Sequence, residues 1–74
     1  MSVLPSIKAL RLLNALLKYG FFVVRIRGSH RFLRHPDGRS LMFAFHDRET
    51  VGPRILSKLV KDARMTTEEL HELL

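Results

Sequence analysis

The sequence contains no cysteine, few prolines and glycines, and far fewer acidic than basic residues. Without cysteine the chain can form neither disulfides nor thiolate metal sites, which agrees with a reducing cytoplasm. No linker, low-complexity segment or internal repeat interrupts its 74 residues. The apolar fraction of 46% is ordinary for a globular chain. We therefore expect a single domain that spans residues 1–74.

Acidic residues are scarcest in the centre of the chain. Between Lys18 and Arg39, both included, six Lys or Arg residues accompany one acid, Asp37. Beyond Lys61 the balance becomes acidic instead. A positive field concentrated on the centre attracts a polyanion or an acidic protein surface, and charge alone does not decide between these partners.

The first two dozen residues are apolar but do not match a signal peptide. Lys8, Arg11 and Lys18 interrupt the apolar run, and no cleavage site of small residues follows it. We expect a soluble cytoplasmic protein without membrane contact.

Hydrophobic periodicity predicts an α+β fold. Gly20 is suited to end the first helix in a left-handed conformation, and Thr66 with Glu69 matches a capping box at the start of the last helix. The predicted elements are a helix at residues 6–18, antiparallel strands at residues 21–26, 30–35 and 40–46, a helix that begins at residue 53, and a short helix that begins after residue 66.

The first helix has a wide apolar stripe. Leu10, Leu13 and Leu17 recur at helical spacing on one side, and Leu12 and Leu16 widen the stripe. The pair of Leu12 and Leu16 is either more core or an apolar surface for a partner.

A turn motif fixes the expected register of the second and third strands. Residues 35–39 match the x-Pro-Asp-Gly-x pattern of a three-residue hairpin loop. If His35 pairs with Arg39, His30 and His46 become diagonal neighbours about 7–8 Å apart. The register then places His30, Phe32, Arg34, Met42, Ala44 and His46 on one face, and Leu33, Leu41, Phe43 and Phe45 on the face beneath the helices.

Imidazoles beside arginines are suited to RNA cleavage without a metal ion. A neutral histidine accepts the proton of a ribose 2′-hydroxyl, a second group protonates the departing 5′-oxygen, and cations stabilise the charge on the phosphate. His30 is the candidate catalytic residue and His46 the candidate second group. Glycine and serine at the strand junction offer backbone N–H groups to a phosphate, and a phenylalanine can stack on an unpaired base. The candidate RNA-binding residues are Gly28, Ser29, Arg25, Arg27, Arg31, Phe32 and Arg34.

Each assignment has an alternative. A strand histidine is often structural, the arginines can form a solvated face, and Phe32 can be a packing residue. A metal site of His30, His35 and His46 is disfavoured because the register turns His35 to the other face. A non-catalytic RNA-binding module would need the arginines without His30. A DNA-binding domain is disfavoured because a meander stands where a helix-turn-helix needs two helices.

Motifs along nearly the whole chain occur together in one order. They are Leu4-Pro5, Gly20-Phe21, residues 27–30 (Arg-Gly-Ser-His), residues 35–39 (His-Pro-Asp-Gly-Arg), a strand that ends in His46, Pro53 leading into Ile55-Leu56, and residues 65–70 (Met-Thr-Thr-Glu-Glu-Leu). In this combination the chain resembles the HicA-type mRNA interferase toxins. The resemblance implies a fold like the double-stranded-RNA-binding domain, with helices on one face of a three-stranded antiparallel sheet.

The resemblance also implies a function. It implies the toxin of a type II toxin–antitoxin system, which cleaves mRNA, inhibits translation and growth, and is neutralised by a HicB-type antitoxin covering the active site. The family's catalytic histidine follows Gly-Ser, so that role falls on His30, and no metal or other cofactor is expected. The chain departs from the family pattern at Ala44, where proline is usual, and at Arg54 and Arg64, where glycine is usual. A left-handed conformation at Arg64 would strain a residue with a Cβ.

Overall fold

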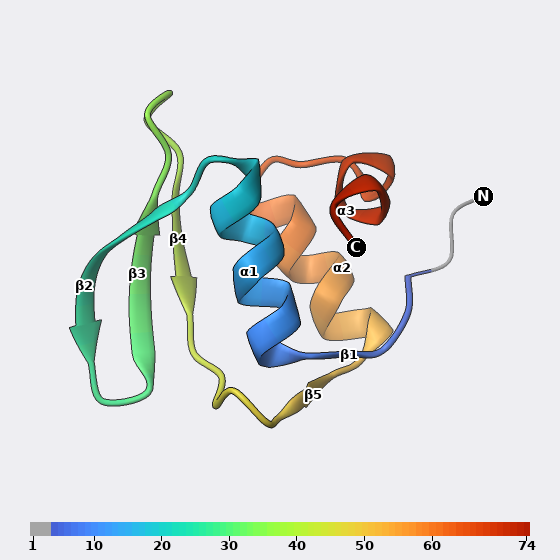
Figure 1. Cartoon of the computed structure of the whole chain (residues 1–74). Coiled ribbons are helices and arrows are strands. Elements are labelled where there is room, and N and C mark those ends of the chain that lie inside the picture. The colour runs from blue at the N-terminus through green and yellow to red at the C-terminus, as the bar shows by residue number, and fades with distance from the viewer. Residues whose placement is uncertain (1–3) are drawn as a thin grey trace.

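The computed structural model describes residues 4–74, so residues 1–3 of the expected domain lie outside the described part. Helices α1 and α2 lie on one face of a three-stranded antiparallel sheet, and α3 packs against both (Figure 1). The sheet has the order β2-β3-β4, and β1 pairs with β5. This is the expected α+β fold of the double-stranded-RNA-binding-domain type. The elements are β1 (Ile7–Lys8), α1 (Ala9–Tyr19), β2 (Phe22–Arg27), β3 (His30–Arg34), β4 (Ser40–Phe43), β5 (Thr50–Val51), α2 (Pro53–Asp62) and α3 (Thr67–Leu73).

Helix α1 begins three residues later than residue 6, because the chain before it pairs as a strand. Ile7 lies opposite Val51 in the two-stranded β1–β5 sheet. The first N–H groups of the helix have no partner within it. Here the Ala9 N–H donates to the Glu49 carbonyl (2.8 Å) and the Leu10 N–H to the Asp47 carbonyl (3.1 Å). The loop of residues 44–49 therefore fixes where α1 starts.

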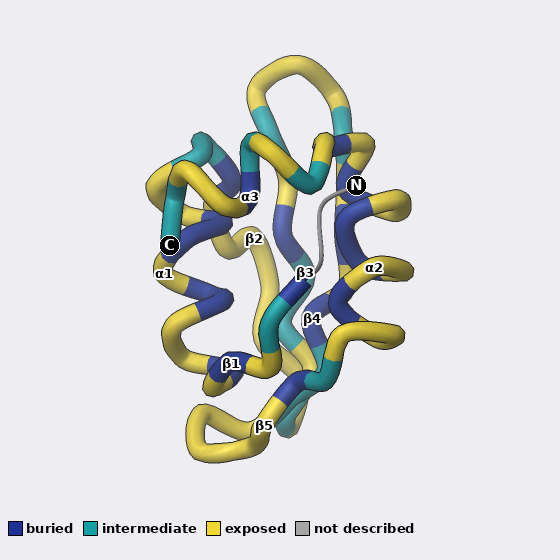
Figure 2. The backbone as a smooth tube through the Cα atoms, turned by 90° about the vertical axis from the view of Figure 1, so that its right-hand side faces the viewer, coloured by how far each residue is buried: buried dark blue, intermediate teal, exposed yellow. Residues whose placement is uncertain are grey.

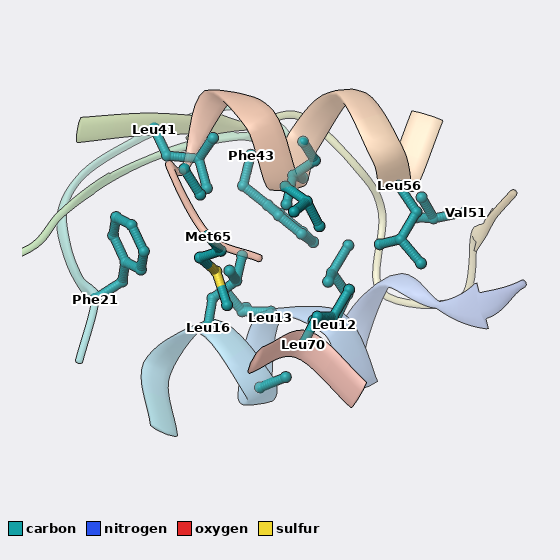
Figure 3. Packing of buried hydrophobic residues seen from close by; sticks show 14 of the residues in the cluster. Leu12, Leu13, Leu16, Phe21, Leu41, Phe43, Val51, Leu56, Met65 and Leu70 are labelled. Carbon is teal, nitrogen blue, oxygen red and sulfur yellow. The ribbon is translucent and has the colours of Figure 1, made fainter. Parts of the chain in front are cut away.

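The buried side of α1 is centred on Leu12 and Leu16, which are fully buried among the side chains of Figure 3. Leu10 and Leu17 are the exposed leucines of this helix. The interpretation of Leu12 and Leu16 as a partner surface is therefore wrong. These two side chains lie in the core that α1 shares with α2, α3 and the sheet.

Helix α2 ends in a left-handed residue that is not glycine. The Arg64 N–H donates to the Lys61 carbonyl (3.0 Å) and the Met65 N–H to the Val60 carbonyl (3.0 Å). This is the Schellman pattern, which places the residue after the helix in the left-handed region. Arg64 has φ 55 and is the one non-glycine residue with positive φ in residues 4–74. The strain expected from the family comparison is therefore present.

The short helix α3 begins with the predicted capping box. The Glu69 N–H donates to Thr66 Oγ1 (3.0 Å), and the Thr66 N–H donates to Glu69 Oε1 (2.8 Å). The Tyr19 hydroxyl donates to Glu69 Oε2 (3.0 Å). The Thr66 N–H and this hydroxyl hold the pKa of Glu69 below its usual value. Glu69 thus joins the end of α1 to the start of α3.

The β3–β4 hairpin has the predicted loop and register. The His35 N–H donates to the Arg39 carbonyl (2.8 Å), and β3 pairs with β4 from Arg34 opposite Ser40 to Arg31 opposite Phe43. The sequence predicted that the third strand of the sheet continues to residue 46. This prediction is wrong, since β4 ends at Phe43. Beyond it the chain enters the loop that receives the first N–H groups of α1.

Arg39 connects this hairpin loop to the helices. Its Nη1 donates to the carbonyls of Ala63 (3.0 Å) and Arg64 (3.2 Å) and to the Tyr19 hydroxyl (3.1 Å). Its Nη2 lies 2.7 Å from Asp37 Oδ2. The hydrogen bonds from Arg39 lower the pKa of Asp37 to about 2. Arg39 thereby binds the carbonyls at the strained end of α2.

The sheet is covered unevenly. Leu33, Leu41 and Phe43 face the helices and are buried, whereas all six residues of β2 are exposed (Figure 2). The pairing of β2 with β3 shifts between Val23 and Arg25. The extra residue, Val24, is the position of a β-bulge, a feature that bends and twists the strand that carries it. No helix in residues 4–74 is long and apolar enough to cross a membrane.

Candidate nucleic-acid interface

The sheet face turned away from the helices carries most of the predicted site residues. Leu33 and Leu41 point to the helices, so the alternate residues of β3 and β4 point outward. Residues directly opposite each other on antiparallel strands share a face. The outer face is therefore formed by the pairs Arg27–His30, Arg25–Phe32, Phe22–Arg34, Arg34–Ser40 and Phe32–Met42. We call these eight residues the outer face.

Gly28 and Ser29 form a two-residue connection between β2 and β3. Gly28 has φ 61 and Ser29 does not have a positive φ, which matches a type II′ turn. A Cβ on Gly28 would meet nothing within 4 Å, so glycine is required by conformation and not by space. The turn makes Arg27 and His30 its closing pair, and both are exposed. The Gly-Ser-His motif thus places an exposed histidine beside an arginine at the tip of the hairpin.

Arg31 points to the opposite side of the sheet from His30. Its Nη2 lies 3.0 Å from Asp47 Oδ1, and 24% of its side-chain surface is exposed. Its Nη1 is the one buried side-chain nitrogen or oxygen without a hydrogen-bond partner in the described chain. Arg31 ties β3 to the loop of residues 44–49, so it does not join Arg25, Arg27 and Arg34 on the outer face.

His46 lies beyond the end of β4, so the cross-strand spacing expected between His30 and His46 does not apply. His46 instead borders an open pocket of about 380 Å³ next to the hairpin tip. The pocket is lined by Gly28, Ser29, Arg31, Phe45, His46, Asp47 and Arg48. The structure therefore brings His46 near Gly28 and Ser29, on the side to which Arg31 points.

His35 has a packing role. Its ring contacts the rings of Phe21 (5.2 Å between centroids) and Tyr19 (5.6 Å), and its Nδ1 accepts the Asp37 N–H (3.2 Å). A Cβ on Gly20 would lie 2.6 Å from its Nε2. Within residues 4–74 no three His, Cys, Asp or Glu side chains are grouped closely enough to hold a metal ion. The alternative of a three-histidine metal site finds no support in this arrangement.

Sequence reasoning did not place Phe22 on the outer face. Strict alternation from Arg25 and Arg27 would put Val23 beside them, but the bulge at Val24 reverses the alternation and puts Phe22 there. No sequence pattern marks the bulge. Phe22 and Met42 are exposed apolar residues among the arginines, so the outer face offers apolar contact as well as charge.

The fold and the outer face define a class of protein: a small α+β domain with a fold like that of the double-stranded-RNA-binding domain and with a basic, partly aromatic sheet surface. A family model described as HicA toxin of bacterial toxin–antitoxin matches residues 11–65. The chain belongs to this family, as its sequence motifs indicated. The matched segment contains the whole outer face and the Gly28-Ser29 turn. The search of curated proteins gave no match.

Proposed function

We propose that this toxin-family domain, residues 1–74, is an mRNA endoribonuclease that works in the cytoplasm without a metal ion and inhibits translation and growth. The observation that supports this most directly is the position of His30. It is exposed at the hairpin tip, on the same face as three arginines and Phe32. Membership in a toxin family adds a reason for a basic surface to act on nucleic acid.

In the proposed reaction His30 acts as the general base. Neutral imidazole accepts the proton of a ribose 2′-hydroxyl, and the 2′-oxygen attacks the adjacent phosphorus. The bond to the 5′-oxygen breaks, and this oxygen takes a proton from a second group or from water. The products are a 2′,3′-cyclic phosphate and a 5′-hydroxyl. Arg27 is the cross-strand partner of His30, with Cβ atoms about 4.5–5.5 Å apart in such pairs. Its guanidinium can therefore stabilise the charge on the same phosphate.

The rest of the outer face would position the RNA. His30, Phe32 and Arg34 alternate along β3, about 6.6 Å from one to the next at the usual strand rise of ~3.3 Å per residue. Arg25 lies opposite Phe32. A single strand running along β3 would place a base on Phe32 and phosphates near Arg25 and Arg34.

His46 remains the proposed second group. It borders the pocket that contains Gly28 and Ser29, while His30 lies on the other side of the same tip. An RNA backbone that crosses the tip could contact both imidazoles and the N–H groups of the turn. Arg31, held by Asp47, would then act from the pocket and not from the outer face.

We also propose that a HicB-type antitoxin covers the His30 face. Toxins of this family work with an antitoxin partner. Phe22 and Met42 give the outer face the exposed apolar side chains that a protein interface uses at its centre. A reading frame for a HicB-type protein beside the gene would support the proposal, and its absence would weaken it.

The catalytic proposal is tested with purified protein, single-stranded RNA and EDTA. Loss of a general base typically lowers rate by about 10²–10⁴-fold, so the His30→Ala variant should lose most cleavage. His71→Ala is the matched control, because His71 is an exposed histidine on α3, away from the sheet. Cleavage by the parent and by His71→Ala, with cyclic phosphate ends, is the expected result. Equal RNA binding and no cleavage by all three proteins would favour a non-catalytic RNA-binding module.

A further inference from the structure

Strand β2 is an edge of the sheet with neither face covered. It has β3 on one side, and the sheet ends there (Figure 1). Its side chains are mostly apolar, yet all six residues are exposed, with Ile26 at 65% and Val24 at 49%. An exposed apolar edge strand is a template for pairing with another chain, and proteins normally shield one. The structure therefore presents a surface that fits an added strand.

A second copy of this chain is a poor occupant. Antiparallel pairing of two β2 strands would bring Arg25 and Arg27 of each copy into one ribbon. The strand contains no acid to balance these four charges. Like charges on neighbouring strands are destabilising. Sliding the register by two residues, the step that keeps the side chains on the same faces, still leaves arginines beside arginines. The positive charge of β2 therefore favours an acidic partner.

We propose that β2 binds an extended, acidic segment of another protein as a fourth antiparallel strand. Addition of a strand to a sheet edge is a known mode of peptide recognition, in which main-chain hydrogen bonds give affinity and alternate side chains give specificity. On the outer face, carboxylates of the partner would lie beside Arg25 and Arg27. On the other face, its apolar residues would extend the surface of Val23 and Ile26. The partner strand alternates acidic and apolar residues.

The backbone geometry identifies the residue that would bond such a strand. Pairs in an antiparallel ladder alternate between bonded and non-bonded, and a two-residue hairpin makes its closing pair a bonded one. That pair is Arg27–His30, so the next residue, Ile26, directs its N–H and C=O away from β3. A proline at position 26 would remove the outward donor without removing a β2–β3 hydrogen bond.

The experiment uses two synthetic eight-residue peptides, one alternating Glu and Val and the other alternating Lys and Val. Binding is measured by titration, and amide hydrogen exchange locates it. The Glu/Val peptide should slow exchange of the Ile26 amide and should bind at least about tenfold more tightly than the Lys/Val peptide. The Ile26→Pro and Ile26→Glu variants should each weaken binding by about tenfold or more. Ile26→Glu keeps the backbone donor and tests the surface if the proline variant does not fold.

The matched control is Ile55→Glu, because Ile55 is an equally apolar, exposed side chain on α2. It should bind the Glu/Val peptide like the parent. The inference is overturned if the Glu/Val peptide does not bind or if both peptides bind equally. It is overturned as well if the amides that the peptide protects from exchange lie outside β2. It is also overturned if an RNA oligonucleotide, and not the peptide, protects the Ile26 amide. None of these results depends on RNA cleavage, so the two proposals fail separately.

Discussion

Arg64 allows a strong test of how α2 ends, because substitution by glycine there should stabilise the protein. Arg64 stands in the left-handed region at φ 55, and its backbone N–H and carbonyl make hydrogen bonds that any residue can make. Its side chain is exposed. The substitution Arg64→Gly therefore removes the clash of a Cβ with the backbone and leaves the Schellman bonds and the contact with Arg39 in place.

The expected change in the free energy of unfolding for Arg64→Gly is the difference between two opposing contributions. A left-handed conformation costs a residue with a Cβ roughly 1–2 kcal/mol. Glycine loses more backbone freedom on folding than other residues, and this entropy loss offsets roughly 0.5–1 kcal/mol of the stabilisation. The expected net increase in the free energy of unfolding is about 0.5–1 kcal/mol. With an unfolding entropy of about 2.1 cal/mol/K per residue, 1 kcal/mol corresponds to roughly 6 °C in a chain of this size, so Tm should rise by about 3–6 °C.

Thermal unfolding followed by circular dichroism, together with urea unfolding, measures the effect. Arg64→Ala removes the same side chain and charge but keeps a Cβ, so it should show no such gain. Lys58→Gly places glycine at an exposed position inside α2, where it should cost about 1 kcal/mol. If Arg64→Gly is no more stable than Arg64→Ala, the strain argument is wrong.

Three further predictions concern other parts of the chain. Gly20→Ala should lower the free energy of unfolding, measured in urea, by about 2 kcal/mol or more, because Gly20 has φ 129 and the new Cβ would lie 2.6 Å from His35 Nε2. Gly28→Ala should lower it by about 1–2 kcal/mol, from backbone conformation alone, because its Cβ would meet no atom within 4 Å. The pKa of Asp37 is lowered from 3.8 to about 2 in the folded state, so its contribution to stability is complete above pH 3.8 and is lost as pH falls through 2. The Tm of Asp37→Asn should therefore fall less than that of the parent between pH 5 and pH 2, and identical pH profiles would contradict this. His46→Ala should reduce RNA cleavage while leaving RNA binding unchanged, and full activity would dismiss His46 as the second group.

The features that the sequence predicted well depend on residues close together in the chain. The hairpin loop at residues 35–39 and the capping box of Thr66 and Glu69 are examples, since each motif contains the groups that bond each other. The register of β3 and β4 followed from the loop, and it correctly put Phe32 and Arg34 on the face opposite the core. Local chemistry was sufficient for these elements.

The errors arose where distant segments compete for the same backbone. Residues 6–8 have helical periodicity, but pairing of Ile7 with Val51 delays the start of α1. Residues 44–46 continue an alternating strand pattern, but their loop provides carbonyls to the Ala9 and Leu10 N–H groups and an ion pair to Arg31. Neither contact leaves a local signal, so both boundaries required the structure. In the candidate site, these two boundary errors changed the expected relation of His46 to His30.

The sequence also did not show which arginines share a surface. In the structure, β2 contributes both to the outer face and to the unpaired edge of the sheet. Arg25, Arg27 and Arg31 look equivalent in sequence, yet the sheet directs Arg31 to an ion pair with Asp47 and leaves the other two on the outer face. Those two arginines also lie on the unpaired edge of the sheet, with Ile26 between them. A strand with carboxylates, added at that edge, would neutralise charge that the RNA phosphates would otherwise meet. The edge and the outer face are therefore expected to compete: an acidic peptide bound at β2 should raise the apparent Kd for RNA, and unchanged RNA affinity at saturating peptide would show that the two surfaces act independently.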